Sequence, residues 1–161
     1  MGISATAQLV YGYNLGGGEI DWLVEEATGE YGALHLDWYD EQDDVEEVGD
    51  FVDVAMRRLL ASVGFTETDW RAAGYHERKK EAQQRLGVTF ETYCSSEFPI
   101  YVLTAHTITA AQGHAQTMDM AALQRQPTEN RWDAQLDTAL QTLGLTPTQP
   151  RPAWLLCSWQ G

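Results

Sequence analysis

Positive charge is scarce in the first part of this chain. Residues 1–65 contain two arginines and no lysine against fourteen acidic residues, which gives this part a net charge of −12. Residues 66–161 carry eight basic and ten acidic residues, so most of the total charge of −14 lies before residue 66. An acidic surface of this kind repels nucleic acids and anionic membranes and favours basic proteins or cations. We therefore expect neither direct nucleic-acid binding nor membrane binding.

Cysteine and long apolar runs are also scarce. The two cysteines, Cys94 and Cys157, have no spacing typical of a metal or redox motif, and we expect both to be free and mostly buried. No window approaches the roughly 20 apolar residues of a membrane-spanning helix. Residues 1–8 lack the basic and apolar regions of a secretory signal. These absences predict a cytoplasmic protein.

The length of 161 residues predicts one domain with a hydrophobic core. An apolar content of 43%, including six tryptophans, argues against a disordered acidic chain. No repeat and no linker divides the sequence. We therefore expect a single domain over residues 1–161.

Hydrophobic periodicity gives the expected elements. Strands are predicted over residues 3–13, 31–39, 88–94, 99–110 and 153–159, helices over 43–64, 75–86 and from Pro127 to Gly144, and a helical turn over 66–74. The second pair of strands, 88–94 and 99–110, is the best hairpin candidate. This order indicates an α+β fold with a mostly antiparallel sheet and two to three helices packed on one face.

Residues 37–53 contain nine carboxylates and no basic residue. A capping-box pattern predicts that the first helix begins at Asp43 or Asp44. Its apolar side would face the sheet through Val45, Val48, Val52, Ala55 and Leu59. The carboxylates would then form one solvent-facing surface, here called the acidic face: Asp40, Glu41, Asp43, Asp44, Glu46, Glu47, Asp50 and Asp53.

Two interpretations of the acidic face are open. Its carboxylates could imitate the phosphates of a duplex and bind a basic protein surface, for example that of a host nucleic-acid-binding protein. Alternatively, acids in the first turn simply stabilise the helix by about 0.3–1 kcal/mol each, while basic residues of the helix over 76–85 neutralise the rest.

Metal and cofactor sites are not expected. Carboxylates could supply oxygen ligands from one short segment, namely Asp37, Asp40, Glu41, Asp43 and Asp44. Their spacing misses the alternating ligands and the central glycine of an EF-hand loop. His106, His114 and Cys94 are too far apart for a usual zinc motif. The three glycines at 16–18 lack the lysine and hydroxyl residue of a phosphate-binding loop.

Catalysis would rest on His106 as a base on the polar side of the 88–110 hairpin. Cys94 or Ser95 could then serve as nucleophile, with Asp119 orienting the imidazole. No glycines of a nucleophile elbow surround Cys94 or Ser95. A buried, unreactive Cys94 is the simpler expectation.

Aromatic residues suggest a third possibility. Trp38 and Trp154 fit a core stripe, whereas Trp159 lies near the chain end and is expected to be the most exposed tryptophan. Trp159 is therefore the candidate interface aromatic. A virion or assembly component could form homo-oligomers through this terminal strand.

Three segments carry a resemblance. They are AQLVYGYNLGGG at residues 7–18, YVLTAHTITAAQG at 101–113 and PAWLLCSW at 152–159. Together they resemble small uncharacterised proteins encoded by bacteriophages of actinobacteria and by some actinobacterial genomes. The resemblance implies a phage or prophage origin, and it implies no activity and no active residues. Our leading expectation is a non-enzymatic accessory protein that binds a basic partner through the acidic face.

Overall fold

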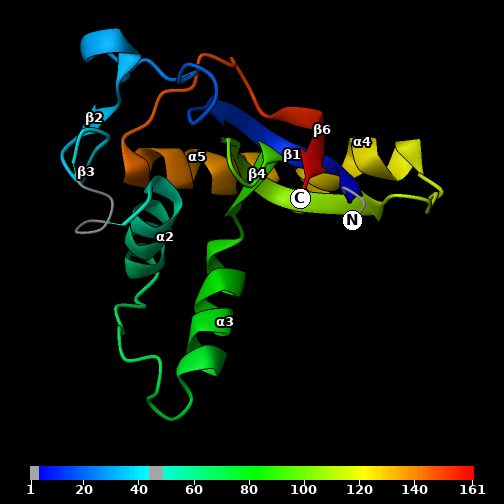
Figure 1. Cartoon of the computed structure of the whole chain (residues 1–161). Helices are drawn as coiled ribbons and strands as arrows, with labels where there is room; N and C mark the ends of the chain where they lie inside the picture. The colour runs from blue at the N-terminus through cyan, green and yellow to red at the C-terminus, as the bar shows by residue number, and fades with distance from the viewer. Residues whose placement is uncertain (1–3, 44–48) are drawn as a thin grey trace.

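The fold is α+β as predicted, with a curled four-stranded sheet and several helices, of which the one labelled α3 extends away from the sheet (Figure 1). The computed structural model describes residues 4–43 and 49–161. Its elements in chain order are β1 (Ala5–Gly16), η1 (Glu30–Gly32), β2 (His35–Leu36), β3 (Tyr39–Asp40), α2 (Phe51–Ser62), α3 (Tyr75–Leu86), β4 (Thr89–Ser95), β5 (Pro99–Ala111), α4 (Met120–Glu129), α5 (Trp132–Leu143) and β6 (Ala153–Gln160). In the described part of the chain the α-helices therefore number four, one more than the upper expectation.

The sheet has the order β1-β5-β4-β6 and closes on itself. β1 pairs with both β5 and β6, and β4 pairs with β5, all in antiparallel orientation. A short parallel pairing of Cys94 with Trp159 and Ser95 with Gln160 completes the closure. The predicted strands over 3–13, 88–94, 99–110 and 153–159 are thus confirmed with shifted ends. The predicted hairpin is also confirmed.

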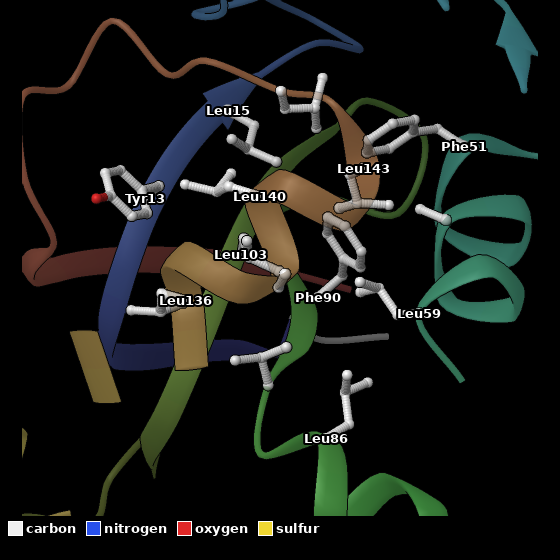
Figure 2. Close-up of a cluster of buried hydrophobic side chains, with 14 of the residues drawn as sticks. Tyr13, Leu15, Phe51, Leu59, Leu86, Phe90, Leu103, Leu136, Leu140 and Leu143 are labelled. Atoms are coloured by element: carbon white, nitrogen blue, oxygen red, sulfur yellow. The ribbon is translucent and has the colours of Figure 1, made fainter. Parts of the chain in front are cut away.

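The alternation of side chains along β1 creates two apolar regions. Tyr11, Tyr13 and Leu15 belong to the main core between the sheet and the helices. Figure 2 shows this core, in which leucines of α5 meet Phe51 and Leu59 of α2. Val10 points to the opposite side of the sheet and is fully buried there. Both faces of β1 are therefore needed for folding.

A β-bulge interrupts the pairing of β1 with β5. Tyr11 pairs with His106 and Gly12 pairs with Thr104, which leaves Ala105 as the extra residue. The buried Thr104 hydroxyl lies 3.1 Å from the Tyr11 carbonyl oxygen and accepts the backbone N–H of His106 at 3.2 Å. A Cβ on Gly12 would lie 1.8 Å from the carbonyl oxygen of Leu103, so only glycine fits there. The bulge fixes where His106 lies.

Helix α2 begins later than predicted. Asp50 is its N-cap, and the Asp50 carboxylate accepts the backbone N–H of Asp53 at 2.8 Å. Gly49 has a left-handed conformation (φ +93°) and Asp50 an extended one, so α2 begins at Phe51, later than the predicted helix start at Asp43 or Asp44. Asp44, Val45, Glu46, Glu47 and Val48 lie outside the described residues. Val52 is half-buried, and Ala55 and Leu59 are buried as predicted.

The strand predicted over 31–39 was wrong. The segment forms the short 3-10 turn η1 and then a small hairpin of two-residue strands, with residues 37–38 in its turn. Tyr31 has a left-handed backbone (φ +59°) next to Gly32, which breaks an extended run. Trp38 nevertheless packs against the core, and its indole N–H donates to the carbonyl oxygen of Leu143 at 2.8 Å.

Of the remaining helices, α3 and α5 were predicted and α4 was not. Helix α3 has the predicted bounds and buries Tyr75, Ala82 and Leu86, and α5 is also confirmed. Residues 66–74, where a short helical turn was predicted, contain hydrogen-bonded turns, in one of which the Ala72 N–H donates to the Asp69 carbonyl oxygen at 3.0 Å. Helix α4 was not predicted, because a proline usually marks a helix boundary, whereas Pro127 lies inside the last turn of this helix.

The structure compensates for Pro127. Proline has no N–H, so the carbonyl oxygen of Leu123 loses its usual helical donor four residues later. The indole N–H of Trp154 donates to this oxygen at 2.9 Å. Helix α4 is thereby joined to β6.

Candidate functional site

Three members of the acidic face stabilise the local structure. Glu41 accepts the indole N–H of Trp22 and the backbone N–H of Leu34, each at 2.8 Å. Asp40 lies 2.8 Å from His35 Nδ1, and hydrogen bonds from the Gln42 backbone and then from His35 lower the pKa of its carboxyl. Asp50 caps α2 as described above. The carboxylates of these three residues already have partners within the chain.

Asp43 and Asp53 are the exposed members of the acidic face without such a role in the described structure. Two of the four basic residues of α3, Arg78 and Arg85, form hydrogen bonds elsewhere. Arg78 makes a bidentate pair with Glu67 at 2.6 and 2.7 Å, and Arg85 donates to the Val63 carbonyl oxygen at 3.2 Å. Among the residues described, no salt bridge joins α3 to the acidic face. The expected neutralisation by this helix is therefore not seen in that part of the chain.

A groove of about 710 Å³ lies between α2 and α3. Met56, Leu60, Phe65 and Tyr75 are among its apolar lining residues. Charged residues of both signs also line it, namely Asp53, Arg57, Glu67 and Lys79. This groove was not foreseen, because its residues come from two helices and their connecting loop.

Trp159 is not the exposed tryptophan that the sequence suggested. It is half-buried at the end of β6, where it pairs with Thr6 and Cys94. Trp70, in the loop between α2 and α3, is 59% exposed, and the Arg71 guanidinium lies 4.7 Å from its ring. The pairing of β6 with β4 that closes the sheet covers Trp159, although this residue lies near the chain end.

His106 covers an aromatic cluster. Its ring is exposed at the surface and stacks on Trp132, with ring centroids 5.0 Å apart and planes 13° apart. Trp154 and Tyr11 pack against Trp132 at 5.8 and 5.5 Å. The Tyr11 hydroxyl donates to Asp133 at 2.6 Å. Burial, and to a smaller extent this hydrogen bond, raises the pKa of the Tyr11 hydroxyl.

A second groove, of about 420 Å³, lies where β4 and β5 meet the end of α3, and is here called the Glu91 groove. Its lining residues are Gln83, Gly87, Val88, Thr89, Glu91, Thr104, Ala105, His106 and Thr107. The half-buried Glu91 accepts a hydrogen bond from the Thr107 hydroxyl at 3.3 Å, and burial raises the pKa of its carboxyl. A groove that joins His106, Thr104 and a carboxylate is the arrangement that would favour an enzyme over a binding protein.

The predicted nucleophile and orienting acid are not brought to His106. Cys94 pairs with Pro99, and His106 lies seven residues further along β5, about 23 Å in an extended strand. Asp119 instead caps α4 through the Ala122 backbone N–H at 3.1 Å. Cys94 and Cys157 are free thiols of intermediate burial, and burial raises the pKa of Cys157.

Within residues 4–43 and 49–161, no group of three or more His, Cys, Asp or Glu side chains is arranged to hold a metal ion. None of the helices in these ranges is long and apolar enough to cross a bilayer. Comparisons with protein-family models, curated proteins and solved structures found no match for this chain. Function must therefore be inferred from the surfaces themselves.

Proposed function

We propose that the chain is a non-enzymatic, phage-type accessory protein of the host cytoplasm that binds a basic macromolecular partner through the acidic face. The supporting observation is that Asp43 and Asp53 are exposed, while Arg78 and Arg85 of the neighbouring α3 form their hydrogen bonds elsewhere. These two acids belong to residues 1–65, which carry a net charge of −12. A field of one sign accelerates encounter with an oppositely charged protein.

The test compares two variants of equal net charge. Asp43→Asn with Asp53→Asn removes one exposed loop acid and one acid from the first turn of α2. Glu97→Gln with Glu77→Gln removes one exposed loop acid and one acid from the first turn of α3. Binding to immobilised poly-L-lysine is measured over a series of sodium chloride concentrations, and a partner captured from host lysate is then measured in the same way.

The acidic-face variant should bind about two- to thirtyfold more weakly than its control at low salt, because each of the two exposed charge pairs contributes about 0.2–1 kcal/mol. The difference should fade as salt rises, because charges beyond about 8 Å are screened at physiological ionic strength. Equal binding by the two variants would mean that only total charge matters. The acidic face would then serve solubility.

An enzyme that uses His106 as base is the second candidate, and the Glu91 groove is the observation that favours it. Against this, the Thr104 hydroxyl is fully buried and bonded to the backbone. Hydrolysis of p-nitrophenyl acetate by the wild type and by His106→Gln tests this candidate, with the exposed His114→Gln as control. A rate no higher than that of free imidazole would exclude general-base catalysis of this reaction by His106.

The assembly candidate rests on Trp159, which the closure of the sheet covers in part. No observation favours it over the acidic face.

A further inference from the structure

Glu91 is a half-buried acid whose only hydrogen bond in the described structure is the long one from Thr107. A carboxylate removed from water without a cation loses solvation that a single hydroxyl does not replace. The described residues that line its groove include no lysine or arginine. The nearby Arg85 donates to the carbonyl oxygen of Val63 instead. The groove therefore holds one acid and lacks a fixed counter-charge.

The surroundings of Glu91 also favour positive charge. Gly87, which ends α3, lines the groove, so the carbonyl end of a 12-residue helix lies beside it. The carbonyl end of a helix carries a partial negative charge and free acceptors. Thr89 and Thr107 add hydroxyl acceptors, and Val88 and Ala105 add apolar surface. Burial raises the pKa of Glu91, which is what a missing partner would cause.

We propose that the Glu91 groove binds a small organic cation with a primary ammonium group on a short alkyl chain, paired with Glu91. An ammonium offers three N–H donors, which suit one carboxylate and two threonine hydroxyls. Its alkyl part would lie against Val88 and Ala105. The volume of about 420 Å³ is within the usual range for small ligands. The site is independent of the acidic face, so it can be tested separately.

The experiment titrates n-butylammonium chloride into the full-length protein and follows the backbone amide resonances of Thr89 and Thr107. Sodium chloride at matched ionic strength is the reference. The wild type, Glu91→Gln and the control Glu97→Gln are compared, because Glu97 is an exposed acid of the β4–β5 turn. A lysine derivative blocked at both backbone ends is titrated in parallel, because a partner's side chain carries the same ammonium group.

The wild type and Glu97→Gln should show saturable shifts, and Glu91→Gln should bind at least about tenfold more weakly, as expected for loss of a charged hydrogen-bond partner. Binding of n-butylammonium at least as tight as that of the blocked lysine supports a free amine as ligand. Tighter binding of the blocked lysine overturns that assignment in favour of a partner protein. Equal binding by Glu91→Gln, or no saturable shift in the wild type, overturns the site.

A measurement on the wild type alone covers the case in which Glu91→Gln fails to fold. The carboxyl resonance of Glu91 is titrated with acid in the presence and absence of n-butylammonium. Bound ammonium stabilises the ionised carboxylate, so the pKa of Glu91 should fall, while that of Glu97 should not follow it. His106 is the other titratable side chain in the groove, and its ring resonances are followed in the same samples. An unchanged pKa of Glu91 at saturating amine contradicts the proposal.

Discussion

At the scale of single residues, Glu91 shows how strand alternation places a polar group in a partly buried position. Glu91 pairs with Val102, and its neighbour Phe90 pairs with Leu103 in the main core. The side chain of Glu91 therefore points to the other face, towards Thr107. The pattern of 88–94 predicted the strand but gave no sign of this carboxylate, because the environment of Glu91 depends on β5 and α3.

The raised pKa of Glu91 predicts a pH effect on stability. A carboxyl whose pKa is higher in the folded state binds its proton more tightly there, so ionisation destabilises the fold as pH rises. The Glu91→Gln variant has no carboxyl to ionise at this position, so it does not lose stability in this way. The stability of Glu91→Gln relative to the wild type should therefore increase from about pH 4, near the ordinary glutamate pKa, towards pH 7.

Urea unfolding at several pH values measures this difference, and Glu97→Gln is the matched control. The control should show no comparable rise. If the unfolding free energy of Glu91→Gln minus that of the wild type stays constant or decreases between pH 4 and pH 7, the burial of this carboxyl is contradicted.

At the scale of elements, α2 shows why a helix start is hard to locate in an acidic segment. Asp43, Asp44 and Asp50 are all acceptable N-caps by residue type. Gly49 and the bond from the Asp53 N–H to the Asp50 carboxylate decide the start in the structure. Asp50→Ala should therefore cost about 1 kcal/mol of stability, while Asp43→Ala should change it by less than about 0.5 kcal/mol.

Chemical denaturation of the two variants checks this expectation. Asp43 is exposed and lies in a bend before the helix, so it is a control with the same substitution. A larger loss of stability for Asp43→Ala than for Asp50→Ala would contradict the role of Asp50 as the N-cap of α2.

Long periodic elements were predictable and short ones were not. The apolar positions of α3 and α5 recur at helical spacing, and both helices appear at their predicted places. The small β2–β3 hairpin depends on tertiary contacts such as the bond from Trp38 to Leu143. Helix α4 depends on Trp154 to satisfy the Leu123 carbonyl oxygen, a partner 31 residues away. Such contacts between distant residues leave no local pattern.

At the scale of the whole molecule, the charge of −14 is divided unevenly between sequence regions, yet both regions share one core. Phe51 of α2 contacts Phe90 of β4 and Tyr101 of β5. The acidic first part is thus held against the second part by aromatic packing. Repulsion among its carboxylates opposes this arrangement, because the described basic residues of α3 do not pair with the acidic face.

This balance predicts that salt stabilises the fold. Raising sodium chloride from 10 mM to 500 mM shortens the screening length from about 30 Å to less than 8 Å. The melting temperature of the wild type should rise, because repulsion among like charges is reduced in the folded state. Asp43→Asn with Asp53→Asn should show a smaller rise than Glu77→Gln with Glu97→Gln, since the removed charges lie where the acids are densest. Differential scanning calorimetry at both salt concentrations measures these shifts. A melting temperature that falls with salt, or an equal rise in both double variants, would show that repulsion within the acidic face does not limit stability.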